Sequence, residues 1–75
     1  MRFDDKLAAR IGEQFRLLRL RANKTQEDLA GDTGMHTNHI SLVERGKRRL
    51  TIESGIKICN ALGVKLSRVL ADLDE

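Results

Sequence analysis

Apolar side chains recur along the first part of the chain three and four positions apart, which is the spacing of one helix face. This stripe consists of Leu7, Ile11, Phe15 and Leu18. It predicts a helix that is capped by Asp4 or Asp5 and frays near residues 23 and 24. On its outer face we expect Arg10, Glu13, Arg16, Arg19 and Arg21.

Two short helices follow, and a glycine separates them. Thr25 is a good helix N-cap because acidic residues occupy the next turn, and Leu29 and Ala30 would face inward. Gly34 can adopt the positive φ that a sharp bend requires.

The third predicted helix runs from position 36 or 37 to about position 45, and Gly46 is placed as its C′ residue. Ile40 and Val43 form its inward pair. The side chains left largely outward are Thr37, Asn38, His39, Ser41 and Leu42. This outward face is small, mostly polar and capable of hydrogen bonding.

Two more helices are predicted in the C-terminal part. Thr51 caps the first and Gly63 ends it, and its inward stripe consists of Ile52, Ile56, Cys59 and Leu62. The last helix begins at about position 66 and carries Leu66, Val69, Leu70 and Leu73 on one side. We assign this surplus apolar surface, together with Ile58, to a partner subunit, so that dimerisation falls mainly within residues 56–73. The alternative is that the last helix completes the core of the protomer.

The composition fits a single all-α domain, residues 1–75, of five helices joined by short turns. A chain this short forms a small core, and a dimer would enlarge it. The one cysteine, Cys59, lies in an apolar run and suits a reducing compartment. Neither a signal peptide nor an apolar run of membrane-spanning length is evident, so we expect a soluble cytoplasmic protein with no membrane partner.

Positive charge gathers just after the third predicted helix. The net charge is +3, and four of the five positions 45–49 are basic, namely Arg45, Lys47, Arg48 and Arg49. Such a cluster suits the neutralisation of phosphates, although charge runs are also common on plain solvated surfaces.

The two short helices around Gly34, at about residues 25–45, have the lengths and spacing of a helix-turn-helix. In that motif the second helix enters the major groove of DNA and reads base edges through side chains near its N-terminus. Asn38 could pair with adenine, and Thr37 or Leu42 could contact a thymine methyl group, so A·T pairs are expected in each half-site. The alternative is a polar surface without a partner.

The sequence resembles the lambda-repressor-like, XRE-type helix-turn-helix regulators. The matching segments are TQEDLA at 25–30, Gly34, Ile40-Ser41, VERG at 43–46 and ALGV at 61–64, and the likeness extends over residues 11–71. More narrowly, GMHTNHISLVERGKRRLTIES followed by IKICNALGV is similar to the controller proteins of restriction-modification systems, which are dimeric activator-repressors.

The resemblance implies roles for individual residues. Gln26 matches a phosphate-contacting glutamine, and its place at a helix N-terminus independently suits an anion. Glu44 matches a buried or half-buried acid that pairs locally with an Arg, and Arg45 has either this role or a phosphate contact. The positions that reach bases are Thr37, Asn38 and Leu42, with His39 sharing base or phosphate contact. The positions that grip the DNA backbone are Arg48, Arg49, Thr51 and Ser54, and Lys47 joins them as part of the basic cluster.

Three positions depart from the family pattern. Leu50 stands where a proline is common, Gly55 where the fourth helix usually has a leucine, and Lys65 where a capping serine is common. These departures concern the packing of the fourth helix and the start of the fifth, and they leave the predicted DNA-reading segment untouched.

Other functions fit the sequence less well. His36, His39 and Cys59 fall short of the four ligands of a zinc site, so neither a metal nor another cofactor is predicted. The motifs of phosphate-binding loops, metalloproteases and serine hydrolases are missing, and we predict no enzymatic activity. The main rival is an antitoxin or other protein-interaction module of the same fold, which usually carries an extended segment that wraps its partner.

The predicted protein is therefore a homodimer that binds double-stranded DNA. Its two recognition helices would lie about 34 Å apart and read a pseudo-palindromic operator. The position of the operator then decides between repression and activation, and RNA polymerase is a further candidate partner. No small-molecule effector is evident.

Overall fold

Five helices make up the described part of the chain, residues 5–73 of a computed structural model. They are α1 (Asp5–Arg21), α2 (Gln26–Thr33), α3 (Thr37–Glu44), α4 (Ile52–Leu62) and α5 (Leu66–Leu73). The predicted all-α, five-helix fold is confirmed. Asp4, one of the two predicted caps of the first helix, lies outside the described residues. Among residues 5–73 no helix is both long and apolar enough to cross a bilayer.

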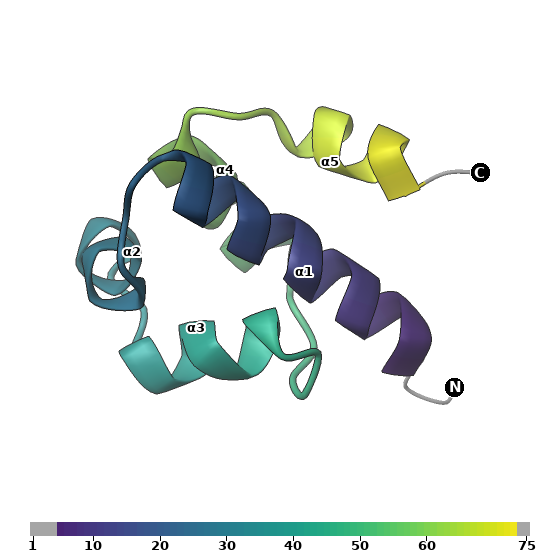
Figure 1. Ribbon diagram of the computed structural model, residues 1–75, viewed down its shortest axis with the longest axis horizontal. Helices are drawn as coiled ribbons and strands as arrows, with labels where there is room; N and C mark the ends of the chain where they lie inside the picture. Colours follow the sequence, from purple (N-terminus) through teal and green to yellow (C-terminus); the bar gives the residue numbers. More distant parts are fainter. Residues whose placement is uncertain (1–4, 74–75) are drawn as a thin grey trace.

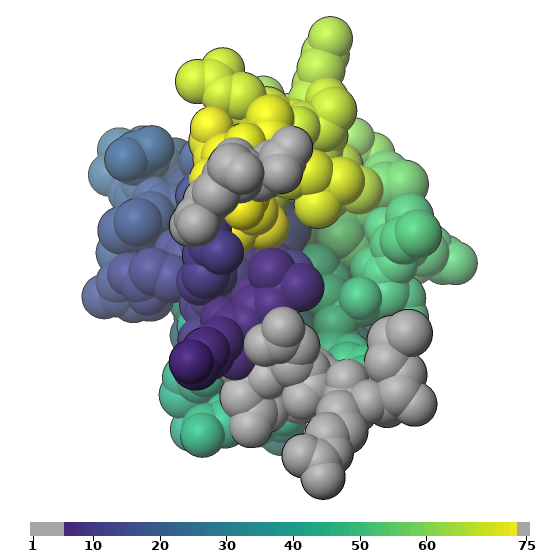
Figure 2. All heavy atoms as spheres, turned by 90° about the vertical axis from the view of Figure 1, so that its right-hand side faces the viewer, coloured from purple at the N-terminus to yellow at the C-terminus, as the bar shows by residue number. Residues whose placement is uncertain are grey.

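The central element is α1, which crosses the molecule diagonally in Figure 1 with α3 below it, α5 above it and α4 behind it. It contacts all three of these helices, while α2 packs against α3 and α4. Figure 2 shows α5, in yellow, against the beginning of α1, in purple. There Arg10 donates a hydrogen bond from Nη2 to the carbonyl oxygen of Leu73, at 3.1 Å. The long first helix thus fixes the position of α3 through direct packing.

Every helix contributes to one core. Its buried members are Phe15, Leu29, Ala30, Ile40, Val43, Ile58, Cys59 and Val69. The predicted inward pairs of α2 and α3 are therefore confirmed, because Leu29, Ala30, Ile40 and Val43 are all buried.

The buried face of α4 differs from the prediction. Its buried residues are Gly55, Ile58 and Cys59, whereas Ile52 is 76% exposed and Ile56 is 44% exposed. Placing Ile58 at a partner subunit was wrong, because this side chain is 1% exposed and belongs to the protomer core. Gly55 explains why α4 buries this face and not the predicted one. A β-carbon on Gly55 would lie 3.3 Å from Leu50 Cδ2, so the side chain of Leu50 covers the position at which the regulators that the sequence resembles usually have a leucine.

The last helix divides its apolar residues between the core and the surface. Val69 is 2% exposed, so its placement in a dimer interface was also wrong. Leu66 and Leu73 are half-buried and pack against the core, whereas Leu70 is 52% exposed. The alternative prediction, that this helix completes the protomer core, is therefore confirmed for three of its four apolar residues, and Leu70 remains at the surface.

Candidate nucleic-acid interface

The bend between α2 and α3 is fixed by local hydrogen bonds. Thr25 caps α2 in a reciprocal arrangement with Asp28, as its Oγ1 accepts from Asp28 N at 3.0 Å and Asp28 Oδ2 accepts from Thr25 N at 2.9 Å. Gly34 follows with a φ of 74°, which glycine adopts without steric cost. The Thr33 hydroxyl donates to the carbonyl oxygen of Leu29 at 2.8 Å and accepts from Met35 N at 3.2 Å. The predicted cap and turn are confirmed, and they set the angle at which α3 leaves α2.

The outer face of α3 begins with polar side chains. Thr37 and Asn38 are exposed, whereas His39 and Leu42 are half-buried and Ile40 is fully buried beneath them. In Figure 1 this helix forms the lower edge of the molecule, with α1 above it. The expected outward orientation of Thr37 and Asn38 is therefore present, because both residues are exposed to solvent.

A basic loop, residues 45–49, continues directly from the end of α3 (Figure 1). The turn is a Schellman motif, in which Gly46 N donates to Val43 O at 3.0 Å and Lys47 N donates to Leu42 O at 2.9 Å. The positive φ of Gly46, 71°, confirms its predicted C′ position. The exposed basic side chains of the loop are Arg45, Lys47, Arg48 and Arg49. Positive charge thus lies at one end of the polar face of α3.

The start of α4 borders the basic loop. Thr51 is exposed, and its hydroxyl oxygen accepts a hydrogen bond from the backbone N–H of Ser54 at 3.0 Å, which confirms Thr51 as the predicted N-cap. Ser54 itself is half-buried. The half-buried Gln26, at the first turn of α2, lies on another part of this surface, beside Thr37 in a groove of about 500 Å³.

Two glycines allow α1 and α3 to approach each other closely. A β-carbon on Gly12 would lie 2.3 Å from the carbonyl oxygen of Val43, and one on Gly46 would lie 2.7 Å from the α-carbon of Ala9. Both neighbouring atoms belong to the backbone, so no side-chain rotation could relieve the clash. The distance between α1 and α3 therefore depends on the absence of side chains at Gly12 and Gly46.

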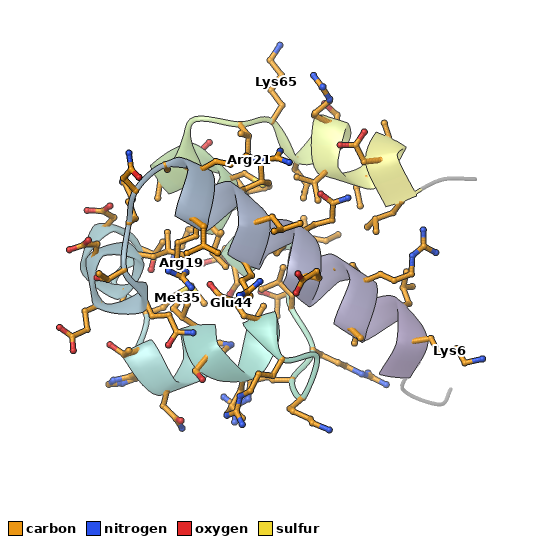
Figure 3. All side chains as sticks on the ribbon, in the orientation of Figure 1. Lys6, Arg19, Arg21, Met35, Glu44 and Lys65 are labelled. Carbon is orange, nitrogen blue, oxygen red and sulfur yellow. The ribbon has the colours of Figure 1, made fainter. Side chains whose placement is uncertain are left out.

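A buried ion pair joins the same two helices. Arg19 donates from Nε to Glu44 Oε2 at 2.7 Å and from Nη2 to Glu44 Oε1 at 3.0 Å, and Figure 3 shows the two side chains facing each other between α1 and α3. Arg19 Nη1 also donates to the carbonyl oxygen of Lys24, at 2.7 Å. The hydrogen bond to Glu44 raises the pKa of Arg19, so the guanidinium stays charged in spite of its burial.

The prediction for Arg19 was wrong, because this side chain is buried and not on the outer face of α1. A signal was available: Arg19 lies four residues after Phe15 and seven after Gly12, both of which are buried. The buried acid at Glu44 is confirmed, but its partner lies 25 residues away in the sequence. Arg45 is exposed and directs its Nε towards Ser41 O at 3.4 Å.

Residues 5–73 contain no group of three or more His, Cys, Asp or Glu side chains arranged to hold a metal ion. Cys59 is a buried core residue, and burial raises the pKa of its thiol. The chemistry of this surface is that of hydrogen bonding and positive charge.

A bent helix pair with an exposed polar second helix and an adjoining basic loop defines a DNA-binding helix-turn-helix. Residues 15–69 match the helix-turn-helix family, and the chain belongs to its XRE-type branch of DNA-binding transcriptional regulators. It is 40% identical to the control protein C.BamHI of Bacillus amyloliquefaciens over 56 residues, which cover 73% of this chain and 69% of that protein.

Solved structures show the same fold. The restriction-modification controller protein C.AhdI of Aeromonas hydrophila matches with a TM-score of 0.80 at 27% identity, covering 83% of this chain and 94% of its own. The wild-type restriction-modification controller protein C.Esp1396I matches with a TM-score of 0.81 at 33% identity, covering 89% of this chain and 87% of its own. The resemblance predicted from the sequence, both to the family and to controller proteins, is confirmed.

Proposed function

We propose that the protein is a sequence-specific regulator that binds double-stranded DNA with α3 in the major groove. The observation that carries the proposal is the exposure of Thr37 and Asn38 at the start of α3, with the exposed basic loop at its end. The residues assigned to base edges are Thr37, Asn38, His39 and Leu42. Those assigned to phosphates are Gln26, Arg45, Lys47, Arg48, Arg49, Thr51 and Ser54.

We also propose that it acts as a controller protein in the cytoplasm, without enzymatic activity and without a small-molecule effector. The names of C.BamHI, C.AhdI and C.Esp1396I support the controller role. An operator that overlaps a promoter would exclude RNA polymerase, whereas one beside it would let the bound protein contact and recruit the polymerase.

The proposed unit is a homodimer formed through α4 and α5. These helices are in contact, and a β-carbon on Gly55 of α4 would lie 3.7 Å from Leu66 Cδ1 of α5. Ile52 and Ile56 lie within one turn of Gly55, and Leu70 lies one turn after Leu66, so exposed apolar side chains come from neighbouring parts of both helices. The proposed interface therefore consists of the exposed Ile52, Ile56 and Leu70, together with the parts of Leu66 and Leu73 that the protomer core leaves accessible.

Selection of operator sequences from a random DNA pool, followed by a salt titration of binding, tests the main proposal. Arg48→Gln in both subunits of a dimer removes two phosphate contacts and should lower the salt slope of binding by about two. Lys65→Gln is the matched control, because Lys65 projects from the edge of the molecule opposite α3 (Figure 3). If no DNA is selected, or if binding is insensitive to salt, the DNA-binding proposal is refuted and a protein partner is favoured.

Light scattering of two charge variants tests the dimer. Leu70→Glu places a carboxylate in the proposed interface and should give a monomer. Leu20→Glu is the control, because Leu20 is similarly exposed, at 46% against 52% for Leu70, but lies on the side of α1 near α2 and α3. A Leu70→Glu protein that remains dimeric would rule out this interface.

A further inference from the structure

Gln26 is attached to the buried ion pair. Its Nε2 donates to Glu44 Oε1 at 3.1 Å, and the same oxygen accepts from Arg19 Nη2 at 3.0 Å. We propose that Glu44 and Arg19 are positioning residues for Gln26, holding its carboxamide in the orientation in which it contacts a DNA phosphate. This inference rests on the proposed DNA-binding function.

The chemistry of the carboxylate fixes the orientation of the amide. A carboxylate only accepts hydrogen bonds, so the NH₂ group of Gln26, and not its carbonyl oxygen, must face Glu44. One amide N–H is then occupied, and the other remains available to an anion. Gln26 is half-buried at the first turn of α2, where backbone N–H groups without intrahelical acceptors also favour an anion.

The ion pair holds the backbone around Gln26 as well as its side chain. Arg19 Nη1 binds the carbonyl oxygen of Lys24, the residue just before the N-cap Thr25. Glu44 is the last residue of α3, and its side chain is 3% exposed. One buried pair therefore links α1, the entry to α2 and the end of α3, and it orders Gln26 before any ligand arrives.

Prior ordering makes binding more favourable, because a long side chain that is already fixed loses little conformational freedom on binding. For one glutamine the gain corresponds to about two- to tenfold in affinity per subunit. The carboxylate that orders Gln26 does not repel the phosphate as a bare charge would, because Arg19 neutralises it through two hydrogen bonds.

A double-mutant cycle on operator binding tests the inference. Gln26→Ala is measured in the wild type and in an Arg19→Met/Glu44→Leu background, where both charges are removed together and neither is left unpaired. In the wild type we expect a loss of about two- to tenfold per subunit, and in the apolar background a loss of less than about twofold. Equal losses in both backgrounds, or no loss in the wild type, would overturn the positioning role.

Gln14→Ala in both backgrounds is the matched control, because Gln14 is the other glutamine of the chain and faces the groove beside Leu73. Its substitution should leave operator affinity unchanged. Thermal melts of all variants show whether a loss of DNA affinity comes from unfolding. If Arg19 and Glu44 had only a structural role, their substitution would lower stability but would not change the effect of Gln26→Ala on DNA binding.

NMR relaxation of the wild-type protein without DNA gives a second test, which does not depend on whether any variant folds. The side-chain ¹⁵NH₂ group of Gln26 should be markedly more restricted than that of Gln14. Equal mobility of the two groups would overturn the inference. A protein that binds no DNA contradicts the proposed function, whereas an additive cycle in a protein that binds DNA contradicts the positioning role alone.

Discussion

Gly12→Ala should strongly destabilise the protein, although alanine is the better helix former. The new β-carbon would lie 2.3 Å from the carbonyl oxygen of Val43 and 2.7 Å from that of Glu44, both on the backbone of α3. To restore ordinary contact distances, α1 and α3 would have to separate by about 1 Å at their crossing. This movement would also disturb the Arg19–Glu44 pair, which spans the same two helices.

Gly31→Ala is a matched reference. Gly31 lies within α2, and a β-carbon there would meet no atom within 4 Å. Both substitutions gain the helix propensity of alanine, about 1 kcal/mol, so their difference isolates the clash. Overpacking costs about 1–3 kcal/mol, and here the rigid backbone neighbours favour the upper end. We therefore expect a net loss of about 2 kcal/mol for Gly12→Ala and a gain of about 0.5–1 kcal/mol for Gly31→Ala.

Thermal unfolding followed by circular dichroism measures this difference. For a domain of this size, 1 kcal/mol corresponds to about 4–8 °C in Tm. Gly12→Ala should thus lower Tm by about 10 °C or more, and Gly31→Ala should raise it by a few degrees. All samples need the same protomer concentration because the proposed dimerisation would make Tm depend on concentration. Equal Tm values for the two variants would refute the close approach of α1 and α3.

Three further predictions concern single groups. Glu44→Ala leaves Arg19 buried without its partner and should cost about 3–5 kcal/mol in urea unfolding, and a loss below about 1 kcal/mol would contradict the buried pair. The hydrogen bond from the backbone N–H of Thr25 lowers the pKa of Asp28, so this contribution to stability is present above its unfolded pKa of about 3.9 and is lost as the pH falls through the folded value. The stability of wild type should therefore fall more steeply in acid than that of Asp28→Asn, and parallel curves would contradict the cap. Burial raises the pKa of Cys59, so its alkylation at neutral pH should follow unfolding in urea, and rapid labelling of the native protein would show that the thiol is accessible.

Features that depend on a few neighbouring residues could be predicted from the sequence. The caps at Thr25 and Thr51 and the left-handed residue Gly46 are all local, because each is set by a side chain or a φ angle within about one turn. The same holds for the outward start of α3, since the buried Ile40 and Val43 fix which side of this short helix faces the core.

Features that depend on packing between distant segments could not be predicted in this way. Glu44 finds its partner 25 residues earlier in the chain. The spacing from Gly12 and Phe15 places Arg19 on the buried face of α1, but no pattern near Glu44 indicates that these two side chains pair. On α4 the apolar residues form two adjoining stripes, so periodicity alone does not decide which one is buried. Gly55 decides which stripe is buried, because the side chains of Leu50 and Leu66 pack against the helix where Gly55 has no side chain. As a result, Ile58 faces the core and Ile52 faces solvent.

Base discrimination by Asn38 is the most direct test of the claim that α3 reads the major groove. Asn38→Ala and the control Asn60→Ala, which alters an exposed residue of α4, are each measured against all single-base variants of the selected operator. We predict that Asn38→Ala loses about 1–3 kcal/mol of discrimination at one base pair in each half-site and that Asn60→Ala retains the wild-type pattern. Undiminished discrimination by Asn38→Ala at every base pair would contradict direct readout by this side chain.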